Sequence, residues 1–376
     1  MHSKLPTIGI DCRFAATKSG IGRYTRELVT HLLKRSDPWS YVLFVSDASD
    51  HGLGDLPRRN NYQLSIINYP HYSLKEQFLL PRTLQKSGIS LFHAPHFNAP
   101  LFSKACPAKR TSPWLSTGSA RSGVPLIATI HDLILHEFPN HAPLPKHIAY
   151  QILMKHTVMR ASHLIAVSEA TRGDLMKRYG EGVGGKTSVI HEGISEEFHP
   201  ASEEEKKRVR IKYELPEIFF LYVGAAKEHK NVQMLIDALP QGKALVLVTG
   251  GKESVALRLK DGVIMLSGVP EEDLPALYSA AACLISPSLA EGFNFPVLEA
   301  FACGCPVIAT KRGSTPEVAG SFASLIEPTP EELRKAMENP PVGNTLEAMA
   351  HAKTFSWERA AKQTADIYAS LLSRIR

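Results

Sequence analysis

The chain alternates short apolar runs with helical patterns, and this alternation occurs twice. A first strand is predicted over residues 7–11, followed by a loop with Gly20 and Gly22 and by an amphipathic helix over about residues 23–33. Further strand-like runs of the first half cover residues 41–45, 64–67, 91–93, 126–130 and 164–167. In the second half, buried strands are predicted over residues 219–223, 245–249, 263–266, 283–286 and 307–310. Continuous apolar strands that alternate with helices predict two doubly wound α/β domains with parallel sheets.

The length of the chain agrees with two domains. At 376 residues it exceeds the roughly 250–300 residues at which a single core stops growing. We expect an N-terminal domain over residues 1–196, a second domain over 197–355, and a terminal helix over 356–376 that packs back on the N-terminal domain. The charged segment 202–215 is typical of a solvated surface helix.

Composition narrows the class of protein. The apolar fraction is 44% and the charged fraction 21%, which is ordinary for a globular protein. Neither a signal peptide nor an apolar run of about 20 residues is present, so we expect a cytoplasmic protein without a membrane span. Five cysteines without a repeated CxxC favour reduced thiols, and Cys303 and Cys305 fit packing roles.

The charge balance favours anionic ligands. The formal net charge is +6 and the pI about 8.9, a modest surplus that suits phosphate groups or anionic lipid surfaces. The basic residues are not interleaved with aromatic platforms, so no nucleic-acid partner is expected.

Two segments suggest contacts with other molecules. Residues 104–123 combine Ser, Thr, Pro and Gly with four basic residues, which predicts a basic loop that is either disordered or in contact with an acceptor. Residues 147–160 mix apolar and basic positions, as in a helix that lies on anionic lipid. A core-facing amphipathic helix explains the same pattern.

The segment 286–310 carries the most chemical information. It predicts a strand end, a loop, a helix from about Pro296, a helix stop at Gly304 and a new strand at Val307. Such a unit directs the backbone N–H groups of residues 292–295 and a helix N-terminus towards one edge of the sheet. We therefore expect an anion, such as a phosphate, to bind there.

Two carboxylates frame this predicted anion site. Glu291 lies in the loop and Glu299 about one turn into the helix. A charge-assisted hydrogen bond from a sugar hydroxyl contributes about 1.5–3 kcal/mol, so two such contacts would orient a bound sugar. Taken alone, Glu299 would be read as an exposed helix glutamate, but its spacing from Glu291 favours a shared site.

These residues resemble a known family. The stretch EGFNFPVLE, residues 291–299, is similar to the E-x7-E signature of the retaining, nucleotide-sugar-dependent glycosyltransferases of family four. The similarity extends, in the family's order, to KSGIGRY at 18–24, IHDL at 130–133, AVSE at 166–169 and YVGAAKEHKN at 222–231. The resemblance implies the GT-B architecture, in which two Rossmann-like domains face a central cleft. It also implies transfer of a sugar, mannose-type here, from a GDP- or UDP-linked donor to a glycan or lipid-linked acceptor.

The resemblance also assigns roles to residues. It implies that His131, Lys230 and Glu291 are catalytic, with Glu291 facing the donor sugar, Lys230 neutralising the diphosphate and His131 contacting the sugar. The family transfers with retention, so no separate nucleophile, metal or other cofactor is expected. The donor-binding residues implied are Gly20, Gly22, Gly224, Lys230, Glu291, Gly292, Phe293, Asn294 and Glu299, the last of these at the ribose.

One position departs from the family pattern. Many members carry an arginine directly after the glycine of this strand, whereas here Ala225 follows Gly224. Lys230, supported by Lys227 or His229, would then supply the positive charge. The departure leaves open a second class of function, a catalytically silent subunit that binds a nucleotide sugar.

Other chemistries remain as alternatives. Glu291 and Glu299 could serve as the acid and base of a GT-B sugar epimerase, although adjacent positions flank a sugar from two faces with difficulty. His131, with Asp132 and His136, could ligate zinc, although no further ligand cluster supports the metal. An oxidoreductase is disfavoured, because Gly20 and Gly22 are not followed by a third glycine.

Overall fold

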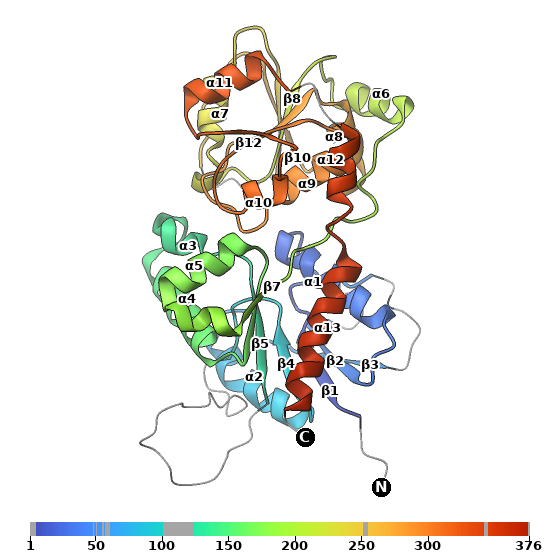
Figure 1. The fold of residues 1–376 in the computed structure, drawn as a ribbon, viewed down its shortest axis with the longest axis vertical. Helices are drawn as coiled ribbons and strands as arrows, with labels where there is room; N and C mark the ends of the chain where they lie inside the picture. Colours follow the sequence, from blue (N-terminus) through green and yellow to red (C-terminus); the bar gives the residue numbers. More distant parts are fainter. Residues whose placement is uncertain are drawn as a thin grey trace. The chain divides into compact units, whose positions relative to one another are not determined.

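The chain folds into two compact units (Figure 1). The computed structural model describes residues 5–47, 49, 51–54, 56, 61–100, 124–250, 255–341 and 345–374, so the predicted basic loop 104–123 lies outside the described residues. Unit 1 comprises Met1–Leu133, Pro145–Glu192 and Trp357–Arg376, and unit 2 comprises Ile134–Leu144 and Gly193–Ser356. The division differs from the sequence-based boundaries chiefly because the short segment 134–144 groups with unit 2.

Unit 1 is built on a seven-stranded parallel sheet. Its strand order is β3-β2-β1-β4-β5-β6-β7. The strands are β1 (Thr7–Asp11), β2 (Ser40–Val45), β3 (Tyr62–Ile66), β4 (Leu91–Ala94), β5 (Leu126–Ile130), β6 (His163–Ala166) and β7 (Thr187–Val189). From the centre of the sheet, strands β1 to β3 follow one another towards one edge, and strands β4 to β7 follow one another towards the opposite edge. The strand order therefore reverses between β1 and β4.

Helices cover the sheet of unit 1. They are α1 (Gly20–Lys34), α2 (Leu74–Lys86), α4 (Leu144–Arg160), α5 (Glu169–Tyr179) and α13 (Trp357–Ser373). The C-terminal helix α13 packs against α1, and its Tyr368 hydroxyl hydrogen-bonds to Nδ1 of His93 on β4 at 2.6 Å. Helix α13 thus belongs to the core of unit 1.

Unit 2 repeats the plan with six parallel strands. The order is β10-β9-β8-β11-β12-β13, and it reverses between β8 and β11. The strands are β8 (Phe220–Val223), β9 (Leu245–Thr249), β10 (Val263–Ser267), β11 (Cys283–Ser286), β12 (Val307–Thr310) and β13 (Ser324–Ile326). The helices are α3 (Ile134–Glu137), α6 (Glu203–Lys212), α7 (Val232–Ala238), α8 (Leu274–Ala280), α9 (Phe295–Ala302), α10 (Thr315–Ala319), α11 (Pro330–Glu338) and α12 (Thr345–Ala352).

The predicted fold class is confirmed in both units. Each has a parallel, doubly wound sheet, and the strands predicted over 7–11, 126–130, 245–249, 283–286 and 307–310 have the observed bounds. The three-residue edge strands β7 and β13 were not predicted, because so short a run has no distinct hydrophobic pattern. Helix α6 is the solvated helix expected there: a capping box between Ser202 and Glu205 starts it, and Val209 is its one buried residue.

Candidate active site

The carboxyl ends of β8 and β11 form the switch point of the unit 2 sheet. In open α/β sheets the loops at such a point diverge and leave room for a ligand. Here the loop after β8 and the loop after β11 are tied together, since the Leu289 N–H donates to the carbonyl oxygen of His229 at 2.7 Å. Seven of the predicted site residues belong to these loops or to the helix that follows: Gly224, Lys230, Glu291, Gly292, Phe293, Asn294 and Glu299.

Lys230 and Glu291 are in direct contact. Lys230 ends a short 3-10 helix over Glu228–Lys230, and its Nζ lies 2.6 Å from Oε1 of Glu291. The same carboxylate oxygen accepts the Ser288 hydroxyl at 2.6 Å. The side chains are 20% and 7% exposed, so the pair is shielded but still reached by solvent. A diphosphate bound here would compete with Glu291 for the ammonium.

Glu299 is buried near the middle of α9. It is 3% exposed, and the hydroxyl of the fully buried Tyr278 donates to its Oε2 at 2.6 Å. The interpretation of Glu299 as an exposed helix glutamate is therefore wrong. A buried carboxylate held at one oxygen is in a fixed orientation, which suits recognition of a hydroxyl pair.

The glycine-containing turn is fixed by Asn294. This residue has a left-handed backbone with φ of 76° and caps α9, which begins at Phe295 with Pro296 in its first turn. Its Nδ2 donates to Ser286 Oγ at 3.0 Å and to Thr315 Oγ1 at 2.9 Å. Gly304, with φ of 71°, follows the end of α9 as predicted.

Gly292 and Phe293, the two predicted site residues before Asn294, differ in their exposure to a ligand. The Phe293 side chain is buried and its ring lies 5.8 Å from that of Phe355, so only its backbone could face a ligand. Gly292 is partly exposed and follows Glu291 directly. The next loop also requires a glycine: a Cβ on Gly313, where φ is 56°, would lie 2.6 Å from the backbone N and O of Glu291.

In the loop after β8, Ala225 follows Gly224 at the position where many members of the resembled family carry an arginine. Gly224 has φ of 143°, and the Tyr222 hydroxyl donates to the carbonyl of Ala225 at 3.1 Å. Lys227 is exposed, whereas the His229 ring is buried 5.8 Å from that of Phe138. Of the two residues expected to support Lys230, only Lys227 has a side chain in solvent.

His131 lies in unit 1, directly after β5. Its Nδ1 is 2.9 Å from Glu192 Oε1, and its Nε2 is 2.9 Å from the carbonyl oxygen of Pro95. Burial alone would lower the pKa of His131, but the hydrogen bond and the charge of Glu192 outweigh it and raise the pKa. Both ring nitrogens face oxygen acceptors, an arrangement that favours the protonated ring. This arrangement leaves neither nitrogen free for zinc.

Gly20 and Gly22 lie inside α1 and not in the loop before it. The helix begins at Gly20 because the Ser19 side chain caps it by accepting the Gly22 N–H. A Cβ on Gly22 would lie 2.1 Å from the Thr17 carbonyl oxygen. The close approach that requires glycine at position 22 is therefore made by the chain's own loop.

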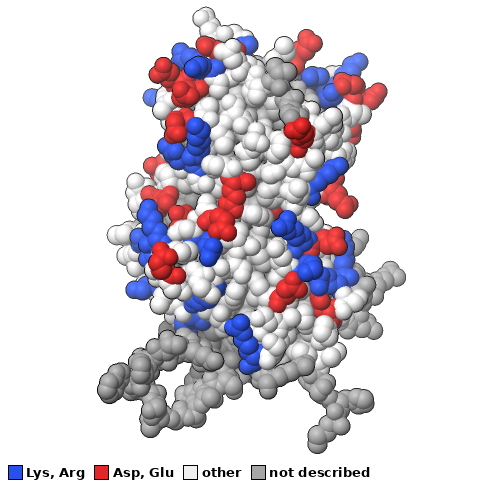
Figure 2. Space-filling view, in the orientation of Figure 1, with Lys and Arg blue, Asp and Glu red and all other residues white. Residues whose placement is uncertain are grey.

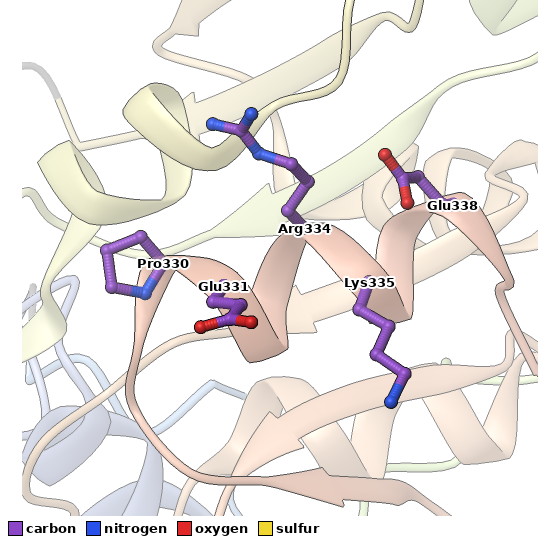
Figure 3. A pocket seen from close by; sticks show the side chains of 5 residues that line it. All are labelled: Pro330, Glu331, Arg334, Lys335 and Glu338. Carbon is purple, nitrogen blue, oxygen red and sulfur yellow. The ribbon is translucent and has the colours of Figure 1, made fainter.

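Surface features outside these loops are less informative. A depression of about 460 Å³ is lined by Pro330, Glu331, Arg334, Lys335 and Glu338, all on α11, and includes none of the predicted site residues (Figure 3). On the visible face, Lys and Arg are interspersed with Asp and Glu, without a large area of one sign (Figure 2). In the part of the chain that is described, no helix is long and apolar enough to cross a bilayer.

The sequence does not predict the residues that contact the predicted site residues. Ser288, Tyr278 and Glu192 each bind a predicted site residue, and Gly313 shapes the backbone around Glu291. Ser288 stands three residues before Glu291 and was a detectable signal. The other three are distant in sequence and come into contact only through the fold.

Two family descriptions match this chain. The description "Glycosyl transferases group 1" matches residues 203–350, and "Glycosyltransferase Family 4" matches residues 18–198. O-antigen chain mannosyltransferase B of Escherichia coli is 29% identical over 266 residues, which are 64% of this chain and 69% of that protein. D-inositol 3-phosphate glycosyltransferase of Salinispora tropica is 30% identical over 310 residues, which are 70% of this chain and 62% of that protein.

Solved structures share the fold. Sucrose-phosphate synthase from Thermosynechococcus elongatus superimposes with a TM-score of 0.71 at 20% identity, covering 98% of this chain and 100% of that one. HepE from Anabaena, in complex with UDP-glucose, gives a TM-score of 0.72 at 19% identity, with 97% and 99% covered. Two Rossmann-like units of this kind define the GT-B class. The chain belongs to the group 1 glycosyltransferases, and its relatives include mannosyltransferases of O-antigen synthesis.

Proposed function

We propose that the protein transfers a mannose-type sugar from a GDP- or UDP-linked donor to a glycan or lipid-linked acceptor, with retention of the anomeric configuration. The observation that carries the proposal is the cluster at the β8/β11 switch point. There an ammonium, Lys230, and two shielded carboxylates, Glu291 and Glu299, lie on elements that follow adjacent strands. This combination suits a ligand with both a diphosphate and several hydroxyls.

The proposed chemistry places charge where it develops. The bond between the sugar C1 and the donor phosphate oxygen breaks, and the leaving diphosphate gains negative charge. Lys230 would stabilise that charge more in the transition state than in the ground state. In front-face attack the acceptor oxygen bonds to C1 and its proton passes to the departing phosphate oxygen, so no enzyme nucleophile is needed. Charge neutralisation by Lys230 leaves the reaction without a required metal in this proposal.

The buried glutamate would hold the nucleotide. Glu299 presents a carboxylate whose position is fixed by Tyr278, and it would accept hydrogen bonds from the ribose hydroxyls. Glu291 would orient the donor sugar once the diphosphate has drawn Lys230 away. His131, whose pKa is raised by the hydrogen bond and charge of Glu192, would contribute positive charge near the donor sugar when it is protonated.

The test is a panel of nucleotide sugars. GDP-mannose, UDP-glucose and related donors are incubated with the protein and a set of glycan acceptors, and release of the nucleoside diphosphate is followed. We expect release with one donor, loss of nucleotide affinity in Glu299→Ala, and a product whose anomeric configuration by NMR equals that of the donor. Silence across the panel, together with unchanged nucleotide affinity in Glu299→Ala, would remove the proposal.

A silent binding subunit is the second candidate, because Ala225 stands where many family members have a cation. Binding of a nucleotide sugar without turnover on any acceptor would favour it. Restoring the charge with Ala225→Arg then separates the two: an active enzyme that gains rate supports the first candidate, and an inert protein that stays inert supports the second.

Peripheral membrane binding is a proposal about a partner. In α4 the predicted core-facing pattern holds for Leu153, which is buried, whereas Ile148, Ile152 and Met159 are each about half exposed. The exposed Lys155 lies among them, so this face suits anionic lipid. The protein should co-sediment with phosphatidylglycerol vesicles, and this binding should be lost at high salt. Equal sedimentation with neutral vesicles would contradict an electrostatic contribution.

A further inference from the structure

Unit 1 has a switch point of its own. The strand order reverses between β1 and β4, so the loops after these strands diverge at the carboxyl edge of the sheet. The loop after β1 brings Arg13 and Phe14 to this edge, and the loop after β4 brings His96. Tyr72 arrives from the segment between β3 and α2.

A buried ion network underlies this edge. The Arg13 side chain is fully buried, and its Nη2 donates to Asp11 Oδ2 at 2.6 Å and to Glu76 Oε1 at 2.5 Å. Asn98 Nδ2 lies 3.0 Å from both oxygens of Glu76. Burying several charges is expensive, so such a network is poor evidence of stabilisation and better evidence of a fixed geometry.

The network fixes the backbone of Tyr72. Oε2 of Glu76 accepts the Tyr72 N–H at 2.7 Å, and Tyr72 has φ of 59°, a left-handed conformation that bulky residues rarely adopt. The Tyr72 hydroxyl hydrogen-bonds to Nδ1 of His96 at 3.2 Å. Even so, Tyr72 is 53% exposed. The Tyr72 ring is thus held in solvent by a strained backbone and two hydrogen bonds, one to Glu76 and one to His96. Backbone strain of this kind is frequent at binding sites.

Other rings back the exposed one. Phe14 and His71 stack at 3.8 Å between centroids, and both lie 6.2–6.3 Å from the Tyr72 ring. His96 lies 6.2 Å from Tyr72 and 6.3 Å from His131. The cluster therefore connects Tyr72 to the residue proposed to lie near the reacting sugar.

A metal is a poor occupant of this edge. Asp11, His71 and Glu76 offer ligand atoms within 4.8 Å of one another. However, Arg13 is already paired with both carboxylates, and a cation would have to displace a fully buried guanidinium. A neutral ligand with an apolar face and hydroxyl edges fits better, because an aromatic face attracts C–H groups and the surrounding polar groups can bond the hydroxyls.

We propose that Tyr72, backed by Phe14, His71 and His96, forms a platform on which a pyranose ring of the acceptor stacks. We refer to these four residues as the Tyr72 platform. The inference rests on the proposed function, since it assigns the acceptor to unit 1 while the donor cluster lies in unit 2. Tyr72 determines acceptor affinity, and the network around Arg13 is a positioning device that keeps its ring presented.

The binding test uses simple sugars. Methyl glycosides of mannose, glucose, galactose and N-acetylglucosamine are offered to the whole protein in saturation-transfer NMR, with GDP and UDP present to occupy the donor site. At least one glycoside should receive saturation, and the signal should disappear in Tyr72→Ala and persist in Tyr72→Phe. Phe78→Ala is the matched control, because Phe78 is a 56% exposed aromatic residue on α2 outside the platform. Absence of any signal, or an equal signal in Tyr72→Ala, overturns the platform.

A kinetic test separates this inference from the proposed function. Tyr72→Ala should raise the KM for the glycoside acceptor about tenfold, corresponding to loss of one aromatic contact. Tyr72→Ala should leave the KM for the nucleotide sugar unchanged. The control Phe78→Ala should leave both KM values and the slow hydrolysis of the donor by water unchanged. An unchanged acceptor KM in a variant that still hydrolyses the donor defeats the platform and leaves the glycosyltransferase proposal standing. A wild-type protein that hydrolyses no donor defeats the proposed function itself.

Discussion

The contact between Lys230 and Glu291 makes a sharp prediction, because stability and activity should respond to it differently. Lys230→Gln removes the ammonium 2.6 Å from Glu291 and leaves that carboxylate, 7% exposed, with the Ser288 hydroxyl. Removing one partner of a fully buried pair costs about 3–5 kcal/mol, and an exposed pair contributes about 0–1 kcal/mol. With Lys230 20% exposed, we expect a loss of about 2 kcal/mol of unfolding free energy.

The double variant Lys230→Gln/Glu291→Gln distinguishes a structural ion pair from a catalytic cation. Replacing both charges removes the unpaired carboxylate, so most of the lost stability should return. Activity should not return, because a developing phosphate charge needs the ammonium and the donor sugar has also lost the Glu291 carboxylate. Loss of one stabilising group of this kind lowers kcat by about 10²–10³. Chemical denaturation measures the first quantity, and nucleoside diphosphate release measures the second.

The control is Lys227→Gln, a lysine on the same loop whose side chain is exposed. It should change stability by less than about 0.5 kcal/mol and kcat by only a few fold. The reasoning is refuted if the double variant recovers activity together with stability, since Lys230 would then matter only as a partner for Glu291. It is refuted equally if Lys230→Gln and Lys227→Gln lose the same activity.

Three further predictions concern the surroundings of the site. Gly22→Ala should destabilise unit 1 by at least about 2 kcal/mol because its Cβ would meet the loop before α1, whereas Gly173→Ala, in open space on α5, should stabilise it by about 0.5–1 kcal/mol; denaturant titrations check both. Glu192→Gln should lower the pKa of His131, since burial then dominates, as an NMR titration would show. The pKa of His131 is raised in the folded wild type, so the stability that Glu192 confers is complete below about pH 6.5. This stability is lost as the pH rises through the folded-state pKa of His131. The wild type and Glu192→Gln should therefore converge in unfolding free energy at high pH. Tyr278→Phe removes the hydroxyl that orients the second motif glutamate and should cost about 1–2 kcal/mol with a measurable loss of nucleotide affinity; an unchanged affinity would mean that this bond serves only the core.

The sequence predicts the fold because the central strands of both sheets are buried on both faces. Runs such as residues 245–249 and 307–310 are wholly buried, so they are apolar throughout and their bounds are visible in the pattern. Helix α1 begins three residues before the start that the sequence predicts, because the cap at Ser19 places Gly20 and Gly22 inside the helix and not in the loop before it.

The candidate site was predictable only where its residues are neighbours in the chain. The turn at Asn294, the helix that follows and the stop at Gly304 follow from local signals. The contacts of His131 with Glu192 and of Glu299 with Tyr278 depend on the packing of distant segments, which no local pattern encodes. The Tyr72 platform is missed for the same reason, since its rings come from three separate loops.

In the proposed function, Lys230 and Glu299 at the β8/β11 switch point bind a nucleoside diphosphate. Calorimetric titration of the wild-type protein and of the Lys230→Gln and Glu299→Ala variants with GDP and with UDP tests it most directly. We expect one-to-one binding of one of the two nucleotides, weakened at least about tenfold in each variant because a charge-assisted contact is lost. Binding of equal strength in all three proteins, or no binding of either nucleotide by the wild type, would contradict it.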